Sequence, residues 1–153
     1  MPSPISVDHD IAAPPEVVWG LVSDITRMGD WSPESTGGAW VKGATGPVVG
    51  ARFKGKNRNG RKSWSTDCTV TEAEPGRTFA FAVTSGPFAV ATWRYDIEPS
   101  DTGCRVTETW IDDRGRLVTI LGKPVSGVAD RAEHNRAGMA ETLRRLGEIA
   151  EQG

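Results

Sequence analysis

Residues 124–151 carry the feature that most constrains the fold, a narrow apolar stripe with the spacing of an α-helix. The face opposite the stripe is charged, and Glu141 and Arg145 lie at the supporting i, i+4 offset. Pro124 suits a first helical turn, and a helix of about 42 Å can lie across a whole sheet. The stripe consists of Val128, Ala132, Asn135, Met139, Leu143, Leu146 and Ala150. We therefore predict a long C-terminal helix that covers a sheet.

The 153-residue chain has the size of one domain, with a net charge of −2 and two cysteines. That charge gives no general attraction to nucleic acid or to an anionic membrane. No apolar run approaches the roughly 18 residues of a membrane span, and the N-terminus lacks a signal-peptide pattern. We expect a cytoplasmic protein without stable membrane insertion, either a monomer or a homodimer. Cys68 and Cys104 are interpreted as reduced core thiols, and no motif indicates a metal or nucleotide cofactor.

The first 50 residues predict two strands separated by short helices. Residues 5–11 alternate between apolar and polar as a half-buried strand does, and two prolines then end the pattern. Glu16 suits the first turn of the helix that follows. The expected elements are a helix at 16–23, one or two further helical turns at 24–30, a loop at 31–38, a short strand at 39–42 and a glycine-rich loop at 43–50.

Two turn signals set the register of the next strands. Asn59-Gly60 predicts a two-residue type I′ turn, and Pro75-Gly76 predicts a type II turn. The resulting registers agree, because one face of both hairpins is apolar while the other is polar or charged. The predicted facing pairs are Phe53–Thr66, Ala51–Cys68, Cys68–Val83 and Val70–Phe81.

The connection at 85–87 decides where the following aromatic residues point. A two-residue turn would direct Trp93 outward, whereas a three-residue loop directs Trp93 and Tyr95 inward. We expect the second, with a four-residue turn at 99–102. The facing pairs are then Trp93–Glu108, Tyr95–Val106 and Asp96–Arg105, the last an exposed ion pair. The predicted inner face comprises Phe53, Trp64, Cys68, Val70, Phe79, Phe81, Val83, Trp93, Tyr95, Val106, Glu108 and Trp110.

Glu108 is the most informative single residue, because its place in the strand directs a carboxylate into this apolar face. Burial there would raise its pKa, and the group could then act as an acid, a base or a hydrogen-bond anchor. The alternative is a structural carboxylate paired with a neighbour, for which His9 on the first strand is a candidate. We favour an anchoring or structural role over catalysis, and Glu108 is the one candidate for a catalytic residue.

Two neighbouring residues of the predicted helix differ in orientation. Asn135 is the polar residue in the middle of the stripe, where it would contact either a ligand or Glu108. His134 points about 140° away from the stripe, so we expect it on the exposed surface. That expectation argues against a catalytic pair of His134 and Asn135.

A basic hairpin tip is a further candidate surface. It could contact phosphate or anionic lipid. Strand alternation places these charges on the outer face or at the turn, so we expect them to be solvated surface. The basic hairpin consists of Lys54, Lys56, Arg58, Arg61 and Lys62.

Several segments together resemble the polyketide cyclase/dehydrase-like branch of the START-related (SRPBCC, helix-grip) superfamily. They are APPEVVW (13–19), WSPE (31–34), GARFKGKNR (50–58), WRYDIEP (93–99), GCRVTE (103–108) and HNRAGM (134–139). The resemblance covers nearly the whole chain and implies a single domain over 1–153. It implies an α+β helix-grip fold, in which a curved antiparallel sheet of about seven strands surrounds the long C-terminal helix and two short helices follow the first strand. No residue pattern matches a defined catalytic set of the family, and fold alone does not name a function.

The inner face is either a ligand cavity or a packed core. An ordinary core uses Leu, Ile and Val, and Trp only where its N–H finds a partner, so Trp64, Trp93 and Trp110 on one face favour a cavity. Together with the resemblance, this predicts binding of an apolar small molecule such as a lipid, polyketide or aromatic metabolite. The expected ligand-binding residues are Trp31 and Trp40 at the mouth, Phe53, Trp64, Phe81, Trp93, Tyr95, Trp110 and Met139 in the interior, and Glu108 and Asn135 as polar anchors.

Two other functions remain open at this point. One is an enzyme of the cyclase/dehydrase type in which Glu108 moves a proton inside a desolvated cavity. The other is a regulatory or toxin-like interaction module that uses the basic hairpin as its contact surface. The sequence does not decide whether any reaction is catalysed.

Overall fold

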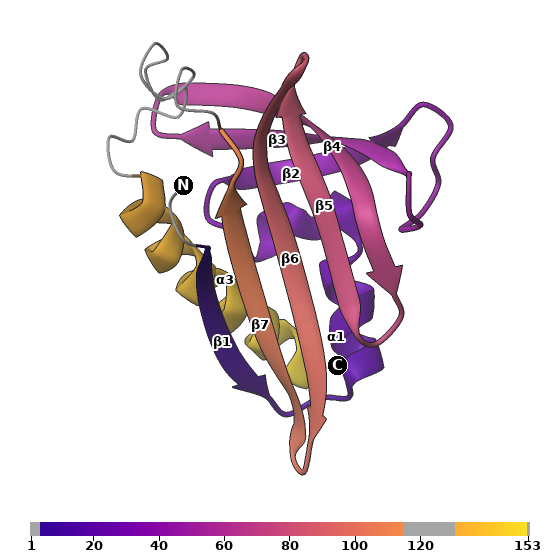
Figure 1. Ribbon diagram of the computed structural model, residues 1–153. Coiled ribbons are helices and arrows are strands. Elements are labelled where there is room, and N and C mark those ends of the chain that lie inside the picture. Colours follow the sequence, from indigo (N-terminus) through magenta and orange to yellow (C-terminus); the bar gives the residue numbers. More distant parts are fainter. Residues whose placement is uncertain (1–3, 115–130, 153) are drawn as a thin grey trace.

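The computed structural model describes residues 4–114 and 131–152, and it shows one curved antiparallel sheet with helices on a single side (Figure 1). The strand order is β1-β7-β6-β5-β4-β3-β2. The elements are β1 (Ile5–Ile11), α1 (Pro15–Val22), the 3-10 helix η1 (Ile25–Asp30), β2 (Ser35–Val41), β3 (Arg52–Asn59), β4 (Lys62–Glu74), β5 (Thr78–Ser85), β6 (Phe88–Ser100), β7 (Gly103–Asp112) and α3 (Arg131–Gln152). The predicted helix-grip fold is confirmed.

The C-terminal helix packs through the predicted stripe. Met139, Leu143, Leu146 and Ala150 are buried, because α3 lies against β1 and β7 while α1 lies against β5 and β6 (Figure 1). The charged face of α3 is held by Arg144 and Arg145, which both bond to Glu141. Val128, the side chain of Ala132 and the expected helix start at Pro124 lie outside the described residues.

The strand predicted at 39–42 begins earlier, at Ser35, and the predicted loop at 31–38 is correspondingly shorter. A bulge between Ser35 and Gly37 adjusts its pairing with β3. A Cβ added to Gly38 would lie 2.9 Å from the backbone oxygen of Ile25, so η1 can pack directly on this strand. Gly38, which permits this close approach, and the neighbouring Gly37 are the residues that resemble a loop in the sequence.

Two hairpins differ from prediction by a shift of two residues. The β3–β4 loop is Gly60-Arg61, so Phe53 faces Cys68 and not Thr66, and the positive φ of 63° at Gly60 fits a type II′ turn. The β6–β7 loop is two residues long, Asp101 and Thr102, which places Glu108 opposite Tyr95 and not Trp93. A shift of two keeps every side chain on its face, so the alternation of polar and apolar residues cannot distinguish the two registers.

The β5–β6 connection combines both alternatives that the sequence offers. Its loop has only two residues, Gly86 and Pro87, but a bulge between Val83 and Thr84 adds the extra residue inside the strand. Trp93 and Tyr95 therefore point inward as predicted. The pairs Cys68–Val83 and Val70–Phe81 are confirmed, and Cys68 and Cys104 are buried free thiols.

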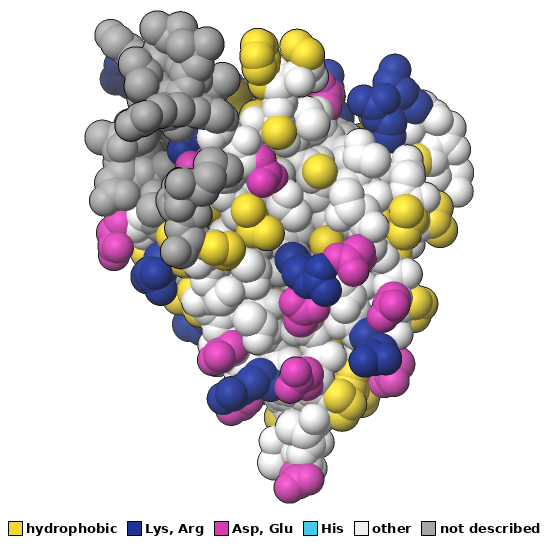
Figure 2. All heavy atoms as spheres, viewed as in Figure 1, with side chains coloured by type: hydrophobic (Ala, Val, Ile, Leu, Met, Phe, Trp, Pro, Cys, Tyr) yellow, Lys and Arg dark blue, Asp and Glu magenta, His cyan; other side chains and the backbone are white. Residues whose placement is uncertain are grey.

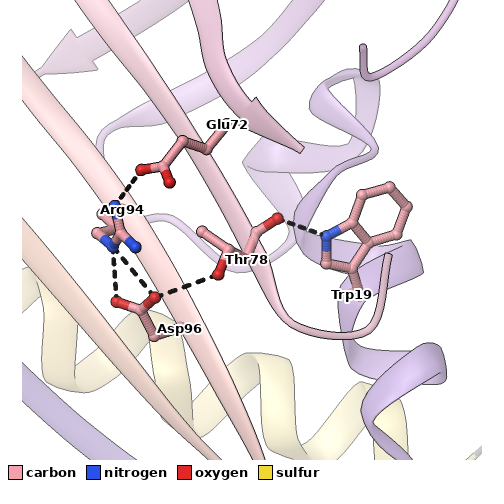
Figure 3. Close-up of polar contacts among 5 residues, drawn as sticks. All are labelled: Trp19, Glu72, Thr78, Arg94 and Asp96. Carbon is pink, nitrogen blue, oxygen red and sulfur yellow. Dashed lines mark hydrogen bonds and ion pairs between the residues drawn. The ribbon is translucent and has the colours of Figure 1, made fainter. Parts of the chain in front are cut away.

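A polar network joins α1 to the outer face of the sheet (Figure 3). The Trp19 indole N–H donates to the Thr78 carbonyl at 2.8 Å, and the Thr78 hydroxyl donates to Asp96 at 3.3 Å. Arg94 bonds to Asp96 at 2.9 Å and also to Glu72. The network fixes the position of α1 over the start of β5.

The predicted ion pair between Asp96 and Arg105 is wrong. The register shift sets Asp96 opposite Thr107, and Arg105 instead bonds to Asp10 of β1 at 3.1 Å. Acidic and basic side chains are interspersed over this outer face (Figure 2). The five residues of the basic hairpin are exposed, as predicted, and no helix of the described residues is long and apolar enough to cross a membrane.

Gly103, at the start of β7, gives a test of this packing. Its φ is 154°, and an added Cβ would lie 2.2 Å from the Ile11 backbone oxygen. We expect Gly103→Ala to lower the free energy of unfolding by about 2–4 kcal/mol in urea denaturation. Gly60→Ala, at a positive φ with open space around it, should cost only about 1–2 kcal/mol. Equal losses in the two variants would contradict the close contact between Gly103 and β1.

Candidate ligand-binding cavity

The inner face of the sheet and α3 enclose a cavity of about 600 Å³. Its walls are mainly apolar and aromatic, as in small-molecule sites. Strands β3 to β7 form one wall, the segment before β2 forms a second, and α3 closes the third. The cavity lies between the large side chains of β3 to β6 and the part of α3 that faces them, because α3 packs closely on β1 and β7 at one edge of the sheet.

Glu108 on β7 is the polar centre of the cavity and is only 3% exposed. Its Oε2 accepts a hydrogen bond from the Tyr95 hydroxyl at 3.0 Å, while its Oε1 has no hydrogen-bond partner among the described residues. Burial raises the pKa of Glu108 to about 8, against the opposing effect of the Tyr95 hydrogen bond. The carboxyl group is therefore mostly protonated at neutral pH in the empty cavity.

Aromatic side chains surround this carboxyl group. Trp93 and Trp110 face each other across β6 and β7, with ring centroids 6.4 Å apart, directly beside the facing pair Tyr95 and Glu108. Burial, followed by the charge of Glu108, holds the pKa of Tyr95 well above its ordinary value, so its hydroxyl stays a donor. Phe53 and Phe81 pack edge to face at 5.1 Å further along the wall.

The helix contributes the opposite wall. Asn135 and Thr142 are buried polar residues that line the cavity, and Met139 lies between them. Gly138 also lines the cavity, and a Cβ added there would meet nothing within 4 Å. The glycine therefore leaves volume that any other residue would occupy.

His134 differs from its predicted exposed position, because it lines the cavity and lies 3.3 Å from Glu34. The contact joins α3 to the segment before β2. His9 is exposed and lies near Gly147, so it is not the partner of Glu108, whose partner is Tyr95. The sequence could not show the contacts of His134 with Glu34 and of His9 with Gly147, because both depend on how α3 lies against the other elements.

The structure brings most of the predicted ligand-binding residues together and separates two from them. Trp31 is 1% exposed in the core below Arg27, so it does not frame the mouth. Trp40 packs its edge on Phe53 at 5.6 Å and borders a smaller hollow beside α1. The predicted residues that line the cavity are Phe53, Trp64, Phe81, Trp93, Tyr95, Glu108, Trp110, Asn135 and Met139.

Other residues at the cavity were not identified from the sequence. Met28 of η1 and Phe88 at the β5–β6 turn line it, and Phe88 is 58% exposed there. Arg114 also lines it, with both side-chain bonds directed to Asp112 at 2.9 and 2.8 Å. No group of three His, Cys, Asp or Glu residues within 4–114 and 131–152 could hold a metal ion.

An antiparallel sheet that surrounds a C-terminal helix and leaves an apolar cavity between them defines a helix-grip protein of the START-like class. The chain belongs to the family described as polyketide cyclase / dehydrase and lipid transport, whose model matches residues 4–151. No curated protein matches the sequence.

Solved structures agree with this assignment. A Polyketide_cyc-like protein from Corynebacterium glutamicum is 36% identical over 99% of this chain and 94% of its own, with a TM-score of 0.65. The di-domain ARO/CYC protein StfQ from the steffimycin biosynthetic pathway is 13% identical over 97% of this chain and 50% of its own, with a TM-score of 0.74. A protein from Chromobacterium violaceum is 15% identical over 98% and 99%, with a TM-score of 0.71. The last two show the fold alone.

The buried carboxyl group predicts a specific pH dependence of stability. The folded protein holds the Glu108 proton up to about pH 8, whereas an unfolded chain releases it near the ordinary value of 4.5. Stability from this group is therefore full below pH 4.5 and is lost as the pH rises to 8. Relative to Glu108→Gln, we expect the wild type to lose about 3–5 kcal/mol between pH 4.5 and 8 in urea denaturation. A difference between the two proteins that does not change with pH would contradict the burial.

Proposed function

We propose that the protein binds an apolar small molecule, such as a lipid, a polyketide or an aromatic metabolite, in the cavity between the sheet and α3. The observation that carries the proposal is a half-open, largely apolar and aromatic cavity of about 600 Å³ whose central carboxyl group has one oxygen without a hydrogen-bond partner among the described residues. A packed core would fill that volume and satisfy that oxygen. The family description, which includes both cyclase/dehydrase activity and lipid transport, supports a ligand of this class.

A neutral fluorescent probe, N-phenyl-1-naphthylamine, tests the proposal directly. Gly138→Leu places an apolar side chain into open cavity space and also removes a glycine from a helix interior, a gain of up to about 1 kcal/mol. We expect the variant to fold at least as stably as the wild type and to bind the probe at least tenfold more weakly, measured by fluorescence titration.

Ala140→Leu is the matched control, since it places the same side chain on the exposed side of the same helix. It should bind the probe like the wild type. Unchanged binding in Gly138→Leu, or equal losses in both variants, would place the probe outside the cavity. Native mass spectrometry of protein purified from its own host would then identify any natural ligand that stays bound.

One observation favours a second candidate, an enzyme of the cyclase/dehydrase type. A carboxyl group with a pKa of about 8 can both give and take a proton near neutral pH. If Glu108 is the acid or base, Glu108→Gln should lower turnover of a bound poly-oxygenated aromatic precursor by about 10²–10⁴-fold while its affinity changes little. A carrier would show no turnover in either protein and at most a change in affinity. Product formation followed by chromatography separates the two.

A further inference from the structure

Among the described residues that line the cavity, one carboxyl group contacts no group that could carry a positive charge. Of the described residues, the titratable groups that line the cavity with Glu108 are Tyr95 on β6, Cys68 on β4, His134 and Glu141 on α3, Glu34 before β2 and Arg114 after β7. Burial keeps Tyr95 and Cys68 neutral, the latter with a pKa of about 11. Of the remaining groups, Glu34 lies against His134, Arg114 bonds to Asp112, and Glu141 bonds to Arg144 and Arg145.

Glu108 differs from all of these because no basic group within 4–114 and 131–152 bonds to it. Its one hydrogen-bond partner is the neutral Tyr95 hydroxyl, and its Oε1, in a side chain that is 3% exposed, has none among the described residues. Trp93 and Trp110, whose ring centroids lie 6.4 Å apart, form the facing pair next to Tyr95 and Glu108 and also line the cavity. Aromatic faces attract cations, and they do so most strongly where water is excluded.

We propose that the cavity takes a cationic amphiphile, with a substituted ammonium group against Glu108 Oε1 and the Trp93–Trp110 pair and an apolar body along Phe53 and Phe81. The inference rests on the proposed function, since it names the class of ligand that the same cavity binds. It also disfavours acids, because the one arginine of the described lining is already held by Asp112 and leaves a carboxylate or phosphate without a free arginine there.

The ionisation of Glu108 makes such a ligand feasible. An ammonium group requires the carboxylate form of Glu108. Because the pKa of Glu108 is about 8, its deprotonation at pH 7 weakens the affinity for such a ligand by a factor of about ten. A cation that binds only the ionised form therefore gains affinity as the pH rises and reaches a plateau above pH 8. A neutral ligand that accepts a hydrogen bond from protonated Glu108 shows the opposite dependence.

The test uses two probes of one shape, a naphthylpropyl trimethylammonium ion and the uncharged compound in which carbon replaces the quaternary nitrogen. Both compete with N-phenyl-1-naphthylamine at pH 7 and pH 9. We expect the affinity of the ammonium probe to rise about tenfold from pH 7 to pH 9 and that of the carbon isostere to stay constant. At pH 9 the ammonium probe should bind at least tenfold tighter than the isostere. In Glu108→Gln the pH dependence and the preference for the cation should disappear while the isostere still binds.

Three results would overturn the inference. One is equal binding of the two probes at both pH values. A second is a loss of affinity for a neutral naphthyl ketone as the pH rises. That result would make Glu108 a hydrogen-bond donor to neutral ligands. In both cases the cavity still binds apolar molecules and the proposed function survives. The third is failure of N-phenyl-1-naphthylamine and of both probes to bind the wild type, which would overturn the proposed function as well.

Discussion

The whole arrangement depends on how little of the sheet one helix can cover. The apolar stripe of α3 is narrow, and it packs on β1 and β7 at one edge. The sheet curves so that α1 and η1 cover part of what remains, and Trp19 and Gly38 fix those two elements by a hydrogen bond and by close approach. Between these contacts the aromatic side chains of β3 to β6 and the facing residues of α3 leave a cavity. The cavity is thus a consequence of the packing and not a separate feature added to it.

Burial of Glu108 gives that cavity its chemistry. A carboxyl group in an apolar site gains a raised pKa, and a single hydrogen bond from Tyr95 is too little to reverse this. Leaving Oε1 without a partner costs free energy in the empty protein. A ligand that supplies this partner recovers the cost, so binding at this point stabilises the fold by mass action. Glu108 Oε1 therefore marks the point of the cavity at which a bound ligand gains by carrying a polar group.

The family resemblance predicted the helix-grip fold, and the alternation of polar and apolar residues predicted the inward face. The alternation failed where it carries no information. A shift by two residues moved Glu108 from Trp93 to Tyr95 without changing its face, so the pattern located the carboxyl group but not its hydrogen-bond partner. His134 was placed wrongly because helical spacing gives an angle around α3 but not the line of its contact with the sheet. Trp31 was expected at the mouth because it lies in loop-like sequence, but the short η1 helix turns it into the core. Trp40, in the predicted strand, packs on Phe53 outside the cavity.

These differences share one physical origin. Side chains on a strand are fixed by local periodicity, whereas the polar contacts of the cavity join elements far apart in the chain, as in the contact of His134 with Glu34. Local patterns therefore predict which residues reach the cavity, and only the packed structure shows which of their charges remain without partners. Among the described lining residues the packing leaves that position at Glu108, next to the facing pair Trp93 and Trp110. Because burial without a partner is unfavourable for a polar group, a position of this kind is better explained by a ligand than by stability of the fold.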